Sequence, residues 1–300
     1  MLKIAYHPRY NHPLPPGHRF PMEKYELLPK QLLYEGTCSE KNFFKPDFAS
    51  EEYILNVHDT DYFNRLKNLE LSKKEIRQSG FPLSKELVDR EMIIAGGTIK
   101  SVLYSLENGI SFNIAGGTHH AYTDRAEGFC LLHDQAIAAR YLQQHKLAQK
   151  ILIVDLDVHQ GNGTAEIFQD DPSVFTFSMH GKGNYPFKKE QSDLDIEVPD
   201  GSGDATYLKL LKDTLPGLIE QENPDFIFYL SGVDILETDK LGRLSCSING
   251  CKERDRFVLQ TCHDLEIPVQ CSMGGGYSKE IRFIIDAHAN TYRLAKEIYF

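Results

Sequence analysis

Six short, largely apolar runs recur along the chain, and they restrict its possible folds more than any other feature of the sequence. They cover residues 2–6, 111–114, 151–154, 174–178, 226–230 and 267–271. Each has the length of a strand that is buried on both faces of a sheet. Apolar residues at helical spacing occupy residues 84–108, 204–222 and 278–299, the last beginning at a capping Ser278. This alternation predicts an α/β fold with a central parallel sheet and helices on both faces.

The chain shows no internal division. No linker rich in proline, glycine or serine, no charge block and no repeat interrupts its 300 residues. We therefore expect a single domain over residues 1–300. The first 60 residues are richer in proline, histidine and aromatic residues, and we expect them to be irregular.

Charge and cysteine content exclude several classes of protein. The chain has 33 Lys and Arg against 43 Asp and Glu, a net charge of −10, which argues against a nucleic-acid partner. No stretch approaches the ~20 apolar residues that span a bilayer, and residues 7–9 interrupt the amino-terminal run before it could act as a signal peptide. Six cysteines without a C-x-x-C pair predict reduced thiols. We expect a cytoplasmic protein without a membrane span, of undetermined oligomeric state.

Polar residues directly follow five of the apolar runs, which is where ligands bind in open α/β sheets. Asp155, Asp157 and His159 are spaced at i, i+2 and i+4, so an extended chain points all three to one side. Two carboxylates and an imidazole at a buried strand end are costly unless a cation lies among them. A divalent metal held by Asp157, His159 and Asp234 would meet that demand and leave an open position, as catalytic metal sites do. The five polar segments are residues 113–120, 154–163, 178–180, 230–234 and 272–277.

A simpler interpretation is available for each of these residues taken alone. An Asp after a strand more often caps the next helix than binds a metal, but the string D-x-D-x-H favours the metal. The pair His119 and His120 could be packed side chains, yet the glycines at 116–117 allow close backbone approach at the sheet end.

Two glycine-rich segments remain. The glycines at 274–276 predict a loop that presents Tyr277. Neither this run nor the G-N-G at 161–163 completes a phosphate-binding motif. Nucleotide binding is therefore disfavoured.

Five motifs stand in a fixed order along the chain: G-G-T-H-H at 116–120, G-F-C at 128–130, D-L-D-V-H-Q-G-N-G at 155–163, G-V-D at 232–234 and G-G-G-Y at 274–277. Over most of its length the chain thereby resembles the histone deacetylase family of zinc-dependent amidohydrolases. The H-Q-G-N-G at 159–163 and the F-P-M-E-K-Y at 20–25 resemble its compact class IV group and bacterial relatives. The resemblance implies the arginase/deacetylase fold, with its central parallel sheet.

The resemblance also implies two metal sites. One catalytic Zn²⁺ would be held by Asp157, His159 and Asp234, although such oxygen-rich ligands also bind other divalent ions, Fe²⁺ among them. A structural K⁺ would take its ligands from Asp155, Asp157, His159, Ser178 and Met179.

The family's catalytic roles carry over by position. His120 would be the general base, His119 would assist electrostatically with Asp155 orienting it, and Tyr277 would donate a hydrogen bond to the scissile carbonyl. Class I members have Asp where this chain has Asn162 as the partner of His120. A neutral amide orients an imidazole but stabilises its cation less, so we expect a less basic His120.

The implied substrate is an acylated lysine. Phe129 and Tyr185 would line a tunnel with Leu241 at its base, although ordinary core packing would explain the same residues. We expect hydrolysis of acetyl or longer acyl groups from the ε-amine of lysine in a peptide or protein, with longer chains at least as good as acetyl. An acetylpolyamine amidohydrolase is the main alternative, since the sequence does not separate the two substrates.

Two further functions rank lower. A binuclear ureohydrolase would share the fold, but it would need Asp at the positions of Gly161 and Leu236. A non-catalytic acyl-lysine binder would be favoured by loss of Tyr277, a metal ligand or a histidine of the pair, and none is lost.

Overall fold

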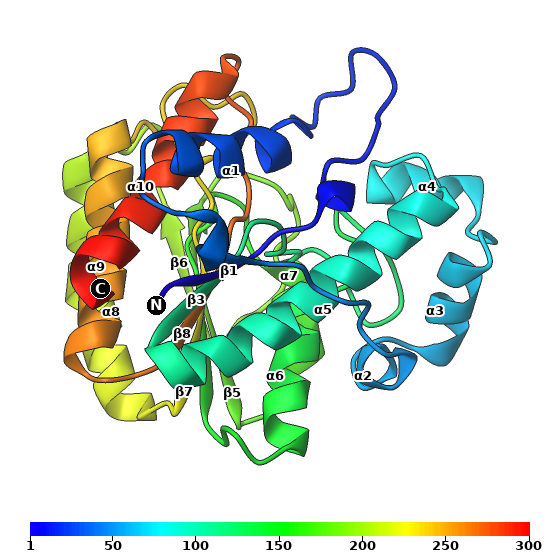
Figure 1. The fold of residues 1–300 in the computed structure, drawn as a ribbon, viewed down its shortest axis with the longest axis horizontal. Helices are drawn as coiled ribbons and strands as arrows, with labels where there is room; N and C mark the ends of the chain where they lie inside the picture. Colours follow the sequence, from blue (N-terminus) through cyan, green and yellow to red (C-terminus); the bar gives the residue numbers. More distant parts are fainter.

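One sheet of eight parallel strands forms the centre of the computed structural model, which describes residues 1–300 (Figure 1). All six predicted strands are present within three residues of their expected bounds. The two others, β2 and β6, are the edge strands and were not predicted. The strands are β1 (Lys3–Ala5), β2 (Phe43–Phe44), β3 (Ile110–Asn113), β4 (Ile151–Asp155), β5 (Val174–Gly181), β6 (Leu194–Val198), β7 (Phe226–Leu230) and β8 (Val269–Ser272).

The strand order explains why the polar segments meet. The sheet runs β2-β1-β3-β8-β7-β4-β5-β6, so the five strands that precede polar segments are contiguous in it. β4 and β7 pair from Ile151↔Phe226 to Asp155↔Leu230, and every residue of both strands is buried. Since parallel strands end at one edge of the sheet, this order brings the candidate residues together.

Helices cover both faces, as the apolar strands require. Figure 1 shows α8, α9 and α10 on one side of the sheet and α5, α6 and α7 on the other. The helices are α1 (Lys24–Tyr34), α2 (Glu51–Leu55), α3 (Thr60–Lys67), α4 (Lys73–Ser79), α5 (Lys85–Asn108), α6 (Asp134–Gln144), α7 (Asn162–Phe168), α8 (Asp204–Glu222), α9 (Ile248–Asp264) and α10 (Ile281–Tyr299), with short 3₁₀ helices η1 (Pro8–Tyr10) and η2 (Glu40–Asn42).

Two of the three predicted helices have the expected ends. Ser84 caps α5 by accepting a hydrogen bond from Leu87 N, and Gly109 ends it with a positive φ of 80°. α8 spans the predicted 204–222. α10 begins at Ile281, three residues after the predicted Ser278, whose hydroxyl lies 2.8 Å from that of Thr238 in the loop between β7 and α9.

The expectation of an irregular amino-terminal segment is wrong. α1 forms there although Pro29 lies inside it, and tertiary packing compensates for that residue's missing N–H. α1 packs against α10, and the Arg293 guanidinium donates two hydrogen bonds to Glu35 at its end, of 2.9 and 2.5 Å.

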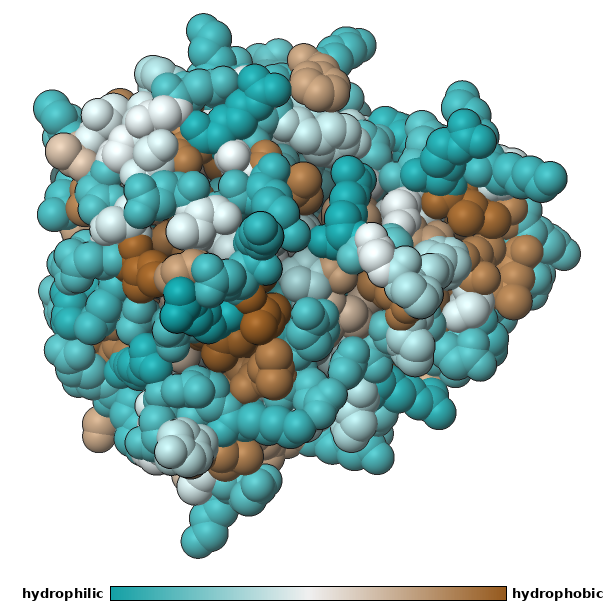
Figure 2. Space-filling model, turned by 90° about the horizontal axis from the view of Figure 1, so that it is seen from above, coloured by the Kyte–Doolittle hydropathy of each residue, from teal (hydrophilic) through white to brown (hydrophobic).

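The surface of the molecule carries both hydrophilic and apolar side chains. The part of the chain that contains α2, α3 and α4 projects beside the main body (Figures 1 and 2). Seen from above, hydrophilic side chains cover most of the surface and apolar ones gather in separate groups (Figure 2). None of the helices combines the length and the apolar character needed to cross a bilayer.

Candidate active site

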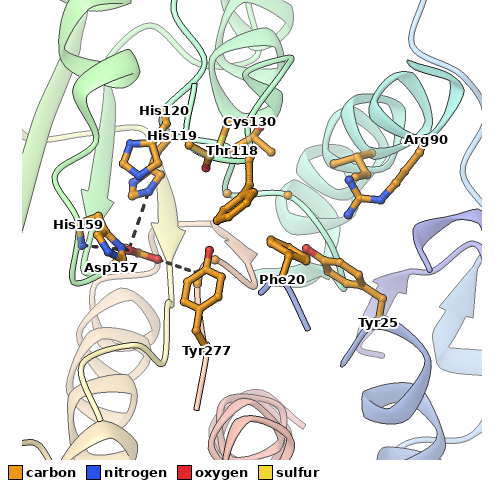
Figure 3. Close-up of a pocket in the computed structure, with 17 residues that line it drawn as sticks. Phe20, Tyr25, Arg90, Thr118, His119, His120, Cys130, Asp157, His159 and Tyr277 are labelled. Atoms are coloured by element: carbon orange, nitrogen blue, oxygen red, sulfur yellow. Dashed lines mark hydrogen bonds and ion pairs between the residues drawn. The ribbon is translucent and has the colours of Figure 1, made fainter. Parts of the chain in front are cut away.

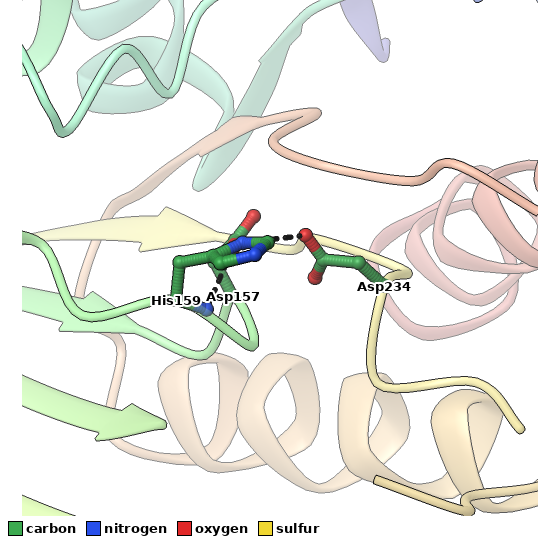
Figure 4. Close-up of side chains that lie close together, drawn as sticks. All are labelled: Asp157, His159 and Asp234. Carbon is green, nitrogen blue, oxygen red and sulfur yellow. Dashed lines mark hydrogen bonds and ion pairs between the residues drawn. The ribbon is translucent and has the colours of Figure 1, made fainter. Parts of the chain in front are cut away.

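Asp157, His159 and Asp234 come together at the carboxyl ends of β4 and β7 (Figure 4). All three are buried, and one potential ligand atom from each lies within 4.8 Å of the others. His159 Nδ1 is 3.0 Å from Asp157 Oδ1 and 3.2 Å from Asp234 Oδ2. The two strands are neighbours in the sheet, which is why residues so far apart in sequence meet.

The electrostatics of this triad fit a divalent cation. Asp234 Oδ2 is buried and accepts no hydrogen bond, although its ion-pair contact with His159 Nδ1 remains. Burial, and next the negative charge of Asp157, raise the pKa of Asp234. Burial lowers the pKa of His159, but the two carboxylates outweigh it and raise the pKa overall. Two buried carboxylates with one imidazole are therefore short of positive charge, and oxygen with imidazole nitrogen is a suitable donor set for Zn²⁺ or Fe²⁺.

Gly275 allows the two carboxylates to approach the loop after β8. Its N–H donates to Asp157 Oδ2 at 2.8 Å. A Cβ at this position would lie 2.0 Å from Asp234 Oδ2 and 2.7 Å from Asp157 Oδ2. Only glycine fits here, so the glycine run does more than make the loop flexible.

The histidine pair follows β3 and is buried beside the triad (Figure 3). His119 Nδ1 lies 2.7 Å from Asp155 Oδ2, and His120 Nδ1 lies 2.6 Å from Asn162 Oδ1. Burial and then the neighbouring His119 and His159 hold the pKa of His120 well below its usual value. Burial also disfavours the charged form of His119, but Asp155 and Asp157 outweigh it and raise that pKa. These opposite pKa directions favour a neutral His120 and a charged His119.

Two cavities meet at these residues. The inner one has a volume of about 40 Å³, and the outer one about 300 Å³. The Tyr277 hydroxyl points toward the space between Asp157 and the histidine pair (Figure 3). Both cavities are lined by His120, Gly128, Phe129, His159 and Tyr277.

The predicted tunnel residues all line the outer cavity. Phe129 and Tyr185 lie on its walls, as does Leu241. Leu241 does not line the inner cavity. The loop after β7 places it outside, where Leu241 N donates to Asp239 Oδ1 at 2.8 Å.

The residues assigned to potassium are neighbours at the ends of β4 and β5. Ser178 is the register partner of Asp155, and Met179 is the next, buried residue. The Ser178 hydroxyl is 2.9 Å from His180 Nδ1.

The structure adds residues that the sequence analysis did not assign to the site. Phe20, Tyr25 and Arg90 line the inner cavity, and the first two belong to the F-P-M-E-K-Y motif, which was the available signal. Lys24 of the same motif donates from Nζ to Gly274 O at 3.0 Å. Glu127 contacts Asn162, and its place directly before the G-F-C motif was the only hint of it.

Known proteins resemble this chain over most of its length. Residues 18–291 match the histone deacetylase domain family. An uncharacterized protein of Picosynechococcus is 45% identical over 99% of both chains. Histone deacetylase 2 of Arabidopsis thaliana is 31% identical over 92% of this chain and 74% of its own.

Two further matches are more distant. The acetoin utilization protein AcuC of Staphylococcus aureus is 28% identical over 80% of this chain and 67% of its own. The crystal structure of the HDA15 HD domain superposes with a TM-score of 0.84 over 99% of this chain and 88% of that one, at 20% identity. The second of these shows the fold alone.

Proposed function

Because this chain belongs to the histone deacetylase family, a family of deacetylase hydrolases, we propose that it removes acyl groups from the ε-amine of lysine. One observation carries the proposal: Asp157, His159, the histidine pair and Tyr277 line the inner cavity where it meets the outer one, and Asp234 is buried beside Asp157 and His159. The junction gives an acyl-lysine a path to the site from the outer cavity, with a smaller space beyond it.

We assign Asp157, His159 and Asp234 as the ligands of one divalent metal ion. Zn²⁺ is the family's ion, and the two carboxylates also suit Fe²⁺. When bound, the ion would supply Lewis-acid polarisation of the carbonyl and a more acidic water. The buried Asp234 Oδ2, which accepts no hydrogen bond, supports this assignment. A structural K⁺ near Asp155 and Ser178 remains a second assignment, supported by their pairing in register.

The protein's own residues would handle protons and developing charge. His120 would take a proton from the attacking water at Nε2, because its Nδ1 faces Asn162, and would return it to the leaving amine. His119, held by Asp155, would stabilise the negative charge of the transition state. The Tyr277 hydroxyl would donate a hydrogen bond to the carbonyl oxygen as its charge grows.

The outer cavity favours lysine over a polyamine. Arg19 and Arg243 line it, and no carboxylate does. A protonated polyamine would meet the Arg19 guanidinium, which has no acidic partner, whereas Arg243 is paired with Asp200; the unpaired cation opposes binding. The stem of an acylated lysine is uncharged and would pack against Phe129 and Tyr185.

The inner cavity favours short acyl groups. Its volume of about 40 Å³ is small beside the about 300 Å³ of the outer cavity. An acetyl group suits this space, whereas octanoyl and myristoyl chains do not. We therefore propose acetyl as the preferred group, in place of the sequence-based expectation that longer chains are at least as good.

We also propose that residues 1–300 act as one domain in the cytoplasm. A single buried core of 78 residues supports the first statement. The six cysteines are all free and buried, which agrees with a reducing compartment.

The test is a substrate panel on metal-loaded protein. We expect kcat/KM for acetyl-lysine peptide to exceed that for butyryl, octanoyl and myristoyl peptides in that order, and to exceed that for N-acetylputrescine. Absence of turnover of every acyl-lysine would contradict the proposal. Selective turnover of N-acetylputrescine would establish the polyamine alternative.

A further inference from the structure

We infer that Glu127 is a positioning residue that sets the tautomer of His120 through the side chain of Asn162. The inference rests on the proposed function, because it concerns how the proposed base is held. Its starting point is the second side of the Asn162 amide, which faces away from the histidine pair. None of the five motifs includes Glu127, and the reaction as described above does not use it.

The amide of Asn162 is held on both sides. Its Oδ1 lies 2.6 Å from His120 Nδ1. Its Nδ2 donates to the Tyr122 hydroxyl at 2.9 Å and faces Glu127 Oε1 at 3.4 Å. Glu127 is well shielded, with 19% of its side chain exposed. Each end of the amide therefore has its own partners.

A carboxylate fixes which end of the amide faces which partner. Carboxylate oxygens only accept hydrogen bonds, whereas an amide has one accepting and one donating end. If the amide were reversed, Asn162 Oδ1 would face Glu127 Oε1 and the two oxygens would repel. Glu127 therefore favours Nδ2 on its own side and Oδ1 on the side of His120, together with the Tyr122 hydroxyl, which donates its hydrogen to Glu190 Oε1 at 3.2 Å and so accepts from Nδ2.

The orientation of the amide decides the protonation of the imidazole. Because Asn162 Oδ1 can only accept, His120 Nδ1 must carry the hydrogen. The neutral imidazole then has its lone pair on Nε2, the atom that would receive the proton from water. An Asp in place of Asn162 would keep the hydrogen on His120 Nδ1 by itself, because both of its oxygens only accept. An amide does so only when its oxygen faces His120, and Glu127 favours that orientation.

The negative charge of Glu127 also favours this orientation of the Asn162 amide and stabilises the protonated form of His120. A separation of 3.4 Å is long for an N–H···O hydrogen bond, so the attraction between this carboxylate and the amide is chiefly electrostatic. When His120 becomes an imidazolium, the nearest carboxylate on its Nδ1 side is Glu127, one side chain further out. The carboxylate would stabilise that cation through the polarised amide.

Glu127 is itself held in place. Glu127 and Cys130 exchange two backbone hydrogen bonds, of 3.0 and 2.9 Å, around a turn in which Gly128 and Phe129 both have positive φ. Its Oε1 also accepts a hydrogen bond from the Tyr185 hydroxyl, and Arg125 Nε lies 3.6 Å from Oε2. One carboxylate thus links the base to a wall of the outer cavity.

The first test is Glu127→Gln, which keeps the shape of the side chain and removes the charge. We expect kcat for acetyl-lysine peptide to fall ~10-fold, the size of effect seen when outer partners of site residues are removed, with KM changed less than ~3-fold. Tyr185→Phe removes only the hydroxyl that reaches Glu127, so its effect should fall on KM. This pair of variants separates the positioning of His120 from the positioning of the cavity wall.

Glu166→Gln is the matched control. Glu166 lies on α7, the helix that begins with Asn162, and it accepts hydrogen bonds from Thr123 N and Oγ1, both at 3.1 Å. It has no hydrogen bond to Asn162. The same chemical change there should leave kcat unaltered.

The second test exchanges the charge between two positions. Asn162→Asp alone would place a second carboxylate next to Glu127, so we expect kcat to fall at least ~10-fold. In the double variant Glu127→Gln/Asn162→Asp, one carboxylate again serves His120, and kcat should recover to within ~3-fold of the unaltered protein. A merely structural role would give additive losses, and additive losses would overturn the inference.

Nitrogen-15 NMR of the imidazole groups tests the inference without turnover. The His120 signals, assigned by comparison with His120→Ala, should show hydrogen on Nδ1 in the unaltered protein and a mixture of tautomers in Glu127→Gln. An unchanged tautomer in Glu127→Gln would overturn the inference. If no acyl-lysine is hydrolysed but the tautomer changes as expected, the proposed function fails and the role of Glu127 stands.

Discussion

Tyr277 is the residue whose proposed role depends most on the transition state. Its hydroxyl would meet a carbonyl oxygen that is fully charged only during reaction, so Tyr277→Phe should lower kcat by ~10²–10³. KM should change little, and so should metal content, because Tyr277 is not among the proposed ligands. Steady-state kinetics and elemental analysis of the same preparation measure both. An unchanged kcat would mean that the ring only packs against Phe20 and Phe129, whose centroids lie 5.9 and 6.1 Å away.

Asp234 should be needed for metal but not for folding. Asp234→Ala relieves the repulsion between two buried carboxylates but also removes the acceptor of Val158 N at 3.0 Å, so the metal-free variant should still fold. Added Zn²⁺ should raise the Tm of the parent, because a ligand that binds only the folded state stabilises it, and should leave that of the variant unchanged. Calorimetry with and without Zn²⁺ measures this. A variant that retains one metal per chain and full activity would contradict the ligand assignment.

The sequence predicted the site where local geometry is sufficient. Asp155 ends β4, whereas Asp157 and His159 lie in the bend that follows it, so the three were expected on one extended segment but are kept together by their nearness in sequence at the strand end. Glu127 could not be found in this way, because its contact with Asn162 depends on a turn at 128–129 and on how α7 lies against it. The position of Leu241 likewise depends on the loop after β7, for which the sequence carries no periodic signal.

At the scale of elements, the contact of α1 with α10 contains the ion pair of Glu35 and Arg293. Burial raises the pKa of Glu35, but hydrogen bonds from Arg293 and from Thr37 and Gln31 outweigh it and lower the pKa to about 2. A folded pKa below the unfolded value adds stability that is present above pH ~4.5 and is lost as the pH falls toward 2. Because the pair is partly exposed, we expect Glu35→Gln to cost ~1 kcal/mol at pH 7.

Urea unfolding of both proteins between pH 7 and pH 3 measures this difference. The gap between the parent and Glu35→Gln should narrow as the pH falls below ~4.5, because the parent then loses its charge as well. Lys30, which pairs with Glu26 on the exposed face of α1, provides a control. Lys30→Gln should leave the free energy of unfolding almost unchanged, because its ion pair is exposed to solvent. A gap that is the same at every pH would show that packing, not charge, joins the helices.

Elements were predictable in proportion to their burial. The central strands are continuous apolar runs because helices cover both their faces. β6 alternates Leu194, Asp195, Ile196, Glu197 and Val198 and lies at a half-exposed edge, and β2 has only two residues, so neither matches that pattern. α1 escaped prediction because Pro29 and the prolines before it argue against a helix, and only its contacts with α10 overcome that local preference.

At the scale of the whole molecule, net charge and local charge have opposite signs. The chain carries −10 overall, yet its outer cavity is lined by Arg19 and Arg243 without a carboxylate. Arg243 is paired with Asp200 at 3.3 Å, whereas Arg19 lies over the Phe129 ring, 4.9 Å from its centre. Arg19 is therefore the cation most available to a substrate at this cavity.

A cation beside the site should select the residues that flank the acetyl-lysine. We expect kcat/KM to be several-fold higher for a peptide with Asp on both sides of the acetyl-lysine than for one with Lys, and the ratio to fall with added salt, because exposed charges are screened over ~10 Å at 0.1 M. Arg19→Gln should reduce the ratio toward one. Arg282→Gln, an equally exposed arginine near the start of α10, should leave it unchanged. If Arg19→Gln and Arg282→Gln behave alike, the preference arises from the field of the whole chain and not from this cavity.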